Sequence, residues 1–176
     1  MTTSGADVAD GARPRSGRVR LRAMARDDLD QVARLELELF EVGPWSRETF
    51  AEELRSRGRR YVVAVAGAEV VGYGGVSVGI DSEVMTLGVA PGWRGAGIGA
   101  RLLADLLAHA RAGRSRRVFL EVRSSNGGAQ RLYERAGFGR VGVREGYYED
   151  GSDAVVMSLV LRGDSPPIGS AEGEQA

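Results

Sequence analysis

A glycine-rich stretch at residues 94–100, RGAGIGA, follows one predicted strand and leads into a predicted helix. Glycines let several backbone N–H groups turn toward one ligand, and the N-terminus of a helix carries a partial positive charge. The chemistry that this arrangement favours is binding of a phosphate or pyrophosphate. The structural alternative is an ordinary helix start in a chain that contains 26 glycines.

The same stretch also fits a dinucleotide-binding pattern. Gly95, Gly97 and Ala100 match G-x-G-x-x-G/A, and Glu121 lies in a strand that ends about 20 residues later. In dinucleotide-binding folds, however, the glycines follow their strand directly, whereas here residues 91–94 intervene. The chain beyond the stretch is also too short for several more strand-helix-strand units. We therefore favour a phosphate loop outside a dinucleotide-binding fold.

Glu121 is the carboxylate best placed for acid-base chemistry. It lies in the predicted strand VFLEV, residues 118–122, where it shares a face with Phe119 while the other face is wholly apolar. Partial burial would make this carboxylate a stronger base and so suit it to proton transfer. The structural alternative is an ion pair with a neighbour such as Arg123.

Other polar residues have ordinary structural explanations. Tyr133 lies on the apolar face of a predicted helix, where a tyrosine is by default a core residue whose hydroxyl is satisfied locally. His109 is the single histidine and lies late on a helix, so we expect it to be half-exposed. Arginines cluster at 55–60 and 111–117, where helices are predicted to end and cations complement the helix dipole.

Composition excludes several kinds of site. The 176 residues include 24 arginines, no lysine and 24 acidic residues, so the formal net charge is +0 and we expect no direct nucleic-acid contact. With no cysteine and one histidine, the chain has no thiolate nucleophile and too few ligands for a metal site. The apolar runs are only as long as strands, so we expect no membrane association and a cytoplasmic location.

Apolar spacing predicts the elements that must position these residues. Strands at 61–66, 70–80 and 83–90 form an antiparallel meander. The helix after the glycine-rich stretch leads to the strand at 118–122, and such a crossover requires a parallel pair. The other predicted elements are a strand at 19–22, helices that open at Asp27, Ser46 and Asn126, and a final hairpin of 140–144 with 153–161.

The expected fold class is therefore α+β, with a mixed, mostly antiparallel sheet that contains one parallel strand pair. We expect one domain at residues 18–162. The segments at 1–17 and 163–176 bury too little apolar area to order themselves and are predicted to be disordered.

Several of these patterns together resemble the GNAT superfamily of acyl-CoA-dependent N-acyltransferases. They are LGV at 87–89, R-x-x-G-x-G at 94–99, LEVRSSN at 120–126, and LY followed by GF within 132–138. The chain is more closely similar to the ribosomal-protein-alanine N-acetyltransferase family through PWS at 44–46, GYY at 146–148 and the run from Asp153 to Met157. The resemblance covers residues 19–161.

The resemblance implies that helices cover both faces of the sheet and that the parallel strands splay around an acetyl-CoA site. Acetyl-CoA would be the co-substrate, Glu121 the general base, and Tyr133 the general acid that protonates the departing thiolate. The residues implied to contact the donor are Leu87, Gly88 and Val89 at the acetyl and pantetheine portion, Gly95, Ala96, Gly97, Ile98, Gly99 and Ala100 at the pyrophosphate, and Asn126 at the pantetheine arm. One departure concerns the acceptor side, because Gly146 stands where the family usually has Asn before its tyrosine pair.

The function that the resemblance implies is acetylation of the N-terminal alanine of a small-subunit ribosomal protein by direct attack in a ternary complex. The partner would be the N-terminal segment of that protein; no oligomeric state is predicted. An amine must be neutral to attack, and at pH 7 roughly 10–15% of a free α-amine is neutral, against about 0.04% of a lysine. This favours an α-amine by about 3.5 kcal/mol. A lysine or small-molecule amine as acceptor, and a non-catalytic acyl-CoA-binding module, remain alternatives.

Overall fold

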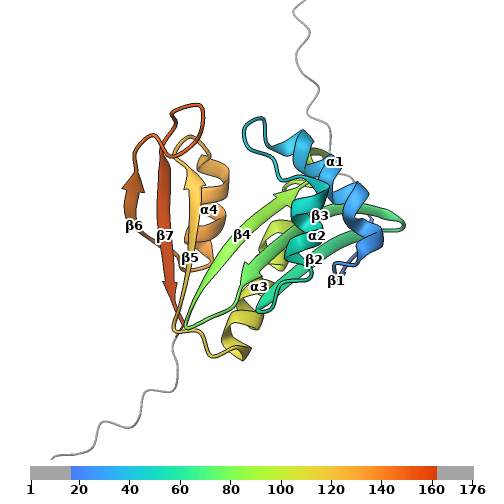
Figure 1. Cartoon of the computed structure of the whole chain (residues 1–176), viewed down its shortest axis with the longest axis horizontal. Helices are drawn as coiled ribbons and strands as arrows, with labels where there is room; N and C mark the ends of the chain where they lie inside the picture. The colour runs from blue at the N-terminus through green and yellow to red at the C-terminus, as the bar shows by residue number, and fades with distance from the viewer. Residues whose placement is uncertain (1–16, 162–176) are drawn as a thin grey trace, which may run out of the picture.

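The computed structural model describes residues 17–161, so the predicted tails lie almost entirely outside the described residues. Within this range the strands form one sheet in the order β1-β2-β3-β4-β5-β7-β6 (Figure 1). The strands are β1 Val19–Ala23, β2 Arg59–Ala66, β3 Glu69–Ser77, β4 Asp81–Val89, β5 Arg117–Arg123, β6 Gly139–Arg144 and β7 Ala154–Val160. Neighbouring strands are antiparallel except β4 and β5, which are parallel. The predicted mixed sheet with one parallel pair is confirmed.

Helices cover both faces of this sheet, as expected. They are α1 Leu29–Leu39, α2 Arg47–Glu53, α3 Ile98–Ala112 and α4 Gly127–Arg135, with the 3-10 turns η1 Arg26–Asp28 and η2 Pro91–Trp93. Side chains alternate along a strand, so Val63 and Val65 of β2 join the core under α1 and α2, whereas Val62 and Ala64 join the core under α3 and α4. No helix within residues 17–161 is long and apolar enough to cross a membrane.

The helix α2 begins where the sequence predicts. The Ser46 hydroxyl accepts a hydrogen bond from the Thr49 N–H (3.1 Å), and the rings of Trp45 and Phe50 pack with centroids 5.3 Å apart. This is a capped helix start with the expected pair of hydrophobic residues around it.

The strand predicted at 70–80 ends at Ser77, and β4 begins at Asp81 instead of residue 83. The sequence remains apolar through Ile80, but residues 78–80 form a turn. The Val78 N–H donates to the Gly58 carbonyl and the Ile80 carbonyl accepts from the Arg116 N–H, each at 2.7 Å. Backbone hydrogen bonds to two neighbouring loops therefore interrupt a segment whose residue types favour a strand.

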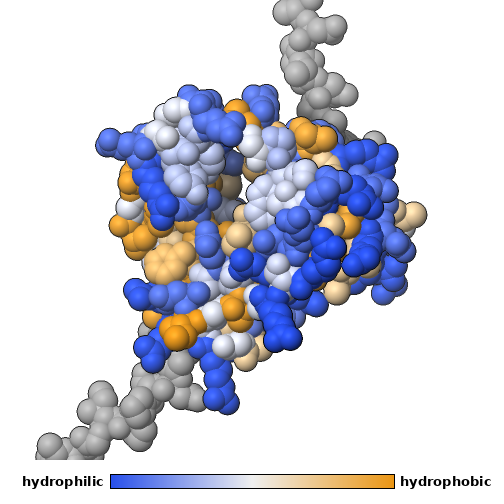
Figure 2. Space-filling view, in the orientation of Figure 1, coloured by the Kyte–Doolittle hydropathy of each residue, from blue (hydrophilic) through white to orange (hydrophobic). Residues whose placement is uncertain are grey.

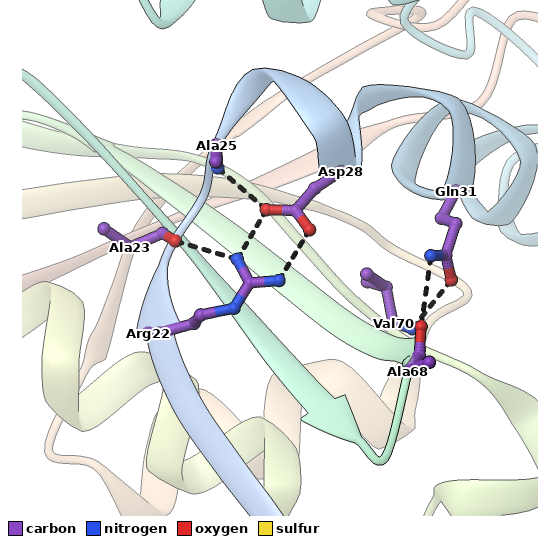
Figure 3. A network of polar contacts seen from close by, with 7 residues as sticks. All are labelled: Arg22, Ala23, Ala25, Asp28, Gln31, Ala68 and Val70. Carbon is purple, nitrogen blue, oxygen red and sulfur yellow. Dashed lines mark hydrogen bonds and ion pairs between the residues drawn. The ribbon is translucent and has the colours of Figure 1, made fainter.

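Polar contacts fix α1 against the sheet (Figure 3). Asp28 accepts hydrogen bonds from both Nη atoms of Arg22, at 2.6 and 2.7 Å, and the bond from Arg22 lowers the pKa of Asp28. One turn later, Gln31 donates to the Ala68 carbonyl (3.2 Å) and accepts from the Val70 N–H (2.9 Å). These contacts join α1 to β1 and to the β2–β3 turn.

The parallel pair is short and the two strands diverge. Only Asp81, Ser82 and Glu83 of β4 pair with β5. Immediately beyond this pairing the β3–β4 register shifts, so that Met85 is an extra residue on β4. Such a bulge bends the strand and increases its twist, and β4 turns away from β5 toward the upper end of the molecule in Figure 1. In the described part of the chain, the backbone of β4 beyond Glu83 therefore has no partner strand on its β5 side.

Candidate active site

A cleft of about 720 Å³ opens where β4 and β5 diverge. Five segments that are distant in the sequence line it: the end of α1 with the α1–α2 connection, the middle of β4, the second half of β5, the start of α4, and the β6–β7 connection. The space-filling view shows a hollow between these two sides of the molecule, with mostly hydrophilic residues around it (Figure 2). The splayed sheet thus creates a cavity with polar groups at its entrance.

Glu121 lies in this cleft with its side chain 17% exposed. Its carboxylate forms an ion pair with Arg144 of β6, with the Arg144 Nε atom 3.0 Å from Glu121 Oε1. It also hydrogen-bonds the Tyr147 hydroxyl, and this bond is the main reason that the pKa of Tyr147 is raised. Burial and an ion pair, which the sequence presented as alternatives, therefore occur together.

The suggested ion pair between Glu121 and Arg123 is wrong. Arg123 donates to Asp150 (2.8 Å) and to Ser152 (2.5 Å), and its guanidinium carbon lies 3.9 Å from the ring centroid of Tyr148. The β6–β7 connection thus draws Arg123 away from Glu121. The residue that does pair with Glu121 comes from β6, which is separated from β5 by β7.

Tyr133 presents a neutral phenol to the cleft. Its side chain is buried against Phe138, with ring centroids 5.9 Å apart. Burial raises the pKa of Tyr133 to about 12, and the nearby Tyr148 adds to this effect. Within residues 17–161 the hydroxyl has no hydrogen-bond partner, so the expected local satisfaction is not found. A protonated phenol without a protein partner in a cleft can donate its proton to a bound group.

The glycine-rich stretch leads from η2 into the start of α3. Gly95 and Gly97 have φ values of 79° and 75°, in the left-handed region that favours glycine. Gly97 is the N-cap residue of α3, and no side chain within residues 17–161 caps this helix, so these residues leave the N–H groups of its first turn available. At Gly99 a Cβ atom would lie 3.3 Å from the side chain of Leu132 in α4. N–H groups at such a helix start can donate to an anion, and the loop lies beside α4.

The structure places the expected catalytic and donor-binding residues in two groups. Leu87, Asn126, Glu121 and Tyr133 line the cleft together. The residues outside its lining are Gly88, Val89, Gly95, Ala96, Gly97, Ile98, Gly99 and Ala100, which continue from the end of β4 through η2 to the start of α3. Asn126 also caps α4, because its Oδ1 atom accepts from the Ala129 N–H at 3.0 Å, which confirms the predicted start of this helix. The fold is not the parallel sheet that a dinucleotide site requires.

Sequence reasoning missed two residues that line the cleft, Tyr147 and Glu36, and one that contacts Glu121 from outside the lining, Arg144. Arg144 pairs with Glu121, but nothing in its local sequence indicates this. Tyr147 hydrogen-bonds Glu121, whereas its sequence shows only that it belongs to a tyrosine pair. Glu36 is buried in the cleft wall, and its spacing from Leu29 and Val32 on one helix face was a signal that could have found it.

The departure at Gly146 has a local explanation. Gly146 has a φ value of 58°, and its N–H donates to Asp153 Oδ1 at 2.9 Å. Glycine and asparagine are the residues that adopt this left-handed conformation most readily. The substitution thus keeps the backbone conformation that an asparagine could adopt here.

The chain is similar to known proteins in sequence and in fold. The Acetyltransferase (GNAT) family model matches residues 29–138. N-alpha-acetyltransferase RimI of Mycobacterium tuberculosis is 45% identical over 147 residues, which cover 79% of this chain and 90% of that protein. The crystal structure of the ribosomal-protein-S18-alanine N-acetyltransferase from Escherichia coli superposes with a TM-score of 0.75 at 25% identity, covering 85% of this chain and 99% of that one.

A more distant structure shares the fold alone. It is Arabidopsis thaliana NAA60 in complex with acetyl-CoA, with a TM-score of 0.76 at 20% identity, covering 83% of this chain and 100% of that one. The sequence match over most of the chain, the fold and the splayed parallel pair agree. The chain therefore belongs to the GNAT family of acetyltransferases, which take their acetyl group from acetyl-CoA.

Proposed function

We propose that this chain acetylates the α-amine of an N-terminal alanine on a small-subunit ribosomal protein, with acetyl-CoA as the donor. The observation that carries the proposal is the cleft in which Glu121 and the unpartnered hydroxyl of Tyr133 both lie. The names of the relatives support the choice of acceptor, since one is an N-alpha-acetyltransferase and another a ribosomal-protein-S18-alanine N-acetyltransferase.

The donor would bind in the cleft where β4 and β5 diverge, and across the glycine-rich stretch. The backbone of Leu87, Gly88 and Val89, on the unpaired side of β4, would hydrogen-bond the acetyl and pantetheine portion, with Asn126 on the opposite wall. The N–H groups of residues 95–100 and the positive end of α3 would hold the pyrophosphate. Acetyl-CoA supplies an acetyl group activated as a thioester. The protein then has to deprotonate the amine and protonate the thiolate that leaves.

Glu121 would accept the proton of the incoming ammonium group, directly or through one water molecule. Tyr147 and Arg144 hold its carboxylate in the free protein. The side chain of Arg144 is 58% exposed and can move aside. The ammonium group of the acceptor can then take the place of the Arg144 guanidinium at the Glu121 carboxylate. Glu121 thus has both the charge to attract the acceptor and the lone pair to deprotonate it.

Tyr133 would protonate the thiolate. Its raised pKa keeps the phenol protonated at neutral pH, and burial disfavours the phenolate until a proton acceptor is bound nearby. Transfer would be direct, from donor to amine. The chain has no cysteine to form a covalent acetyl-enzyme, and its single histidine, His109, bonds the Asp105 carbonyl on α3 and is not among the cleft residues.

Charge around the cleft favours a cationic acceptor segment. Glu38 and Glu41 lie on the α1–α2 side, and Glu149 and Asp150 on the β6–β7 side. Among the cleft-lining residues, Arg123 is the single basic one, and it already pairs with Asp150. A protonated N-terminus that enters between the two sides would therefore meet carboxylates on both.

The ribosomal part of the proposal can be tested in cells. We expect that small-subunit ribosomal proteins from cells that lack this chain include one with a free N-terminal alanine. Incubation with the purified chain and acetyl-CoA should add one acetyl group to that protein at its α-amine, as located by tandem mass spectrometry. If no small-subunit protein changes while another cellular protein gains an N-terminal acetyl group, the α-amine chemistry stands and the ribosomal acceptor is wrong.

A further inference from the structure

A buried carboxylate on the acceptor side of the cleft takes no part in the proton transfers above. Glu36 of α1 is 3% exposed and lines the cleft wall. Its two carboxylate oxygens have different partners: Oε1 accepts from the Trp45 N–H at 3.1 Å, and Oε2 accepts from the Tyr73 hydroxyl. Burial raises the pKa of Glu36, and the two hydrogen bonds oppose that rise. Both oxygens are thus used within the protein.

Glu36 anchors both ends of the α1–α2 connection. Its backbone carbonyl accepts from the Phe40 N–H at 2.9 Å where α1 ends, and its side chain accepts from Trp45, just before α2. Between these two points the chain forms a loop, residues 40–45, whose Phe40, Glu41, Val42, Gly43 and Trp45 line the cleft. One residue therefore closes the base of the loop that forms the acceptor-side wall.

Tyr73 connects this anchor to the donor strand. It lies on β3 opposite Gly88 of β4, and a Cβ atom on Gly88 would lie 2.8 Å from the Tyr73 ring. The Tyr73 hydroxyl, which donates to Glu36, also forms a hydrogen bond with the side chain of Thr86 in β4. A continuous path of contacts thus runs from β4, next to Leu87, through Tyr73 and Glu36 to Trp45.

Stability alone does not account for this arrangement. Tyr73 belongs to the apolar and aromatic cluster under α1 and α2, and the Glu36 carboxylate that it contacts is 3% exposed. A carboxylate buried in this way loses hydration that its hydrogen bonds only partly replace. An apolar residue of similar volume would fill the space without that cost. What a methionine or leucine could not provide is an acceptor for the Trp45 N–H and the Tyr73 hydroxyl at once.

We propose that Glu36 is a positioning residue which, with Tyr73, holds the loop at residues 40–45 at a fixed place relative to β4 and so determines the affinity for the acceptor. This inference rests on the proposed function, because it takes the cleft between the loop and the β6–β7 connection as the acceptor site. The expected effect is on acceptor KM, with little change in kcat or in the Kd of acetyl-CoA.

The test compares Glu36→Met with the conservative Glu36→Gln. Methionine removes both acceptors, and we expect acceptor KM to rise about tenfold, in line with the loss of a buried hydrogen bond. Glutamine keeps an oxygen for the Trp45 N–H, and its amide can donate to the Tyr73 oxygen. Glu36→Gln should therefore stay within about threefold of the wild type, the effect of at most one weak hydrogen bond.

Tyr73→Phe provides a second variant in case Glu36→Met does not fold, and Tyr61→Phe is its matched control. Tyr61 lies in the same apolar cluster and donates to Glu53 at 2.8 Å, but neither residue lines the cleft. Both variants lose one hydrogen bond from a buried tyrosine to a carboxylate. Only Tyr73→Phe should raise acceptor KM; equal changes in the two variants would overturn the proposal.

Amide hydrogen exchange supplies a measurement that does not depend on activity. In Glu36→Met the amides of Trp45 and of residues 41–43 should exchange faster, whereas Glu36→Gln should exchange like the wild type. Unchanged exchange in Glu36→Met would overturn the anchoring role, as would an equal loss of kcat in both Glu36 variants. If the wild type acetylated no free N-terminus but the exchange results were as expected, the proposed function would fail and the anchoring of the loop would stand.

Discussion

Substitution of Glu121 by glutamine should lower kcat by roughly 10²- to 10⁴-fold, the usual contribution of a general base. Glutamine keeps the volume of the side chain and a hydrogen-bonding partner for Tyr147, but it cannot accept the proton of an ammonium group. Because Glu121 has no part in the donor loop, the Kd of acetyl-CoA should remain within about twofold of the wild-type value. Single-turnover kinetics at saturating donor and acceptor would measure the loss at the chemical step.

Glu83→Gln is the matched control for this variant. Glu83 is the same residue type in the same sheet, on β4 opposite Phe119 of β5, but it is exposed and does not line the cleft. We expect its kcat to equal that of the wild type. A Glu121→Gln protein that kept wild-type kcat would show that another group deprotonates the amine. A Glu121→Gln protein that no longer bound acetyl-CoA would assign Glu121 to donor binding instead.

The second large effect is expected for Tyr133→Phe, which should lower kcat by about 10²-fold, the lower part of the range for general acid catalysis. The ring remains to pack against Phe138, and within residues 17–161 the hydroxyl has no hydrogen bond to lose. The melting temperature and the Kd of acetyl-CoA should therefore stay unchanged. A lower kcat with an unchanged melting temperature indicates that Tyr133 is a general acid. A tyrosine with only a core role would lose stability without a specific loss of kcat.

The pKa of Tyr133 adds a pH criterion. Because that pKa is about 12, the phenol remains protonated well above neutral pH, so the wild-type rate should not fall between about pH 8 and 10 through loss of this proton. Tyr61→Phe, the same chemical change in the other core, should leave kcat unchanged. Full activity in Tyr133→Phe would remove Tyr133 from the mechanism, and a loss of folding would make its role structural.

Much of the fold could be predicted because its signals are local. Alternating apolar and polar residues indicate the strands, and apolar residues at helical spacing indicate α3. Ser46 and Asn126 identify helix starts, because their side chains can cap the first turn. The glycine-rich stretch follows a strand and leads into a helix as predicted, and Gly95 and Gly97 adopt left-handed conformations that glycine accepts readily. These features need only a few neighbouring residues to be recognised.

The rest of the site depends on register between distant segments. The bulge at Met85 sets where β4 leaves β5, and its residue type does not distinguish it from its neighbours in the strand. The ion pair between Arg144 and Glu121 crosses from β6 to β5, and it depends on how both strands align with β7. Arg123 was a reasonable partner for Glu121 by distance along the chain, but Asp150 and Ser152 in the β6–β7 connection bind it instead.

Acetyl transfer from acetyl-CoA to a matched set of short peptides distinguishes an α-amine from a lysine as the acceptor. The set contains free N-terminal alanine, other free N-termini, and a blocked N-terminus with an internal lysine, and mass spectrometry locates each acetyl group. We predict acetylation of free N-termini, fastest for alanine, with none at the lysine of the blocked peptide. Transfer to the lysine alone, or to no peptide although acetyl-CoA binds, would contradict an N-terminal acetyltransferase.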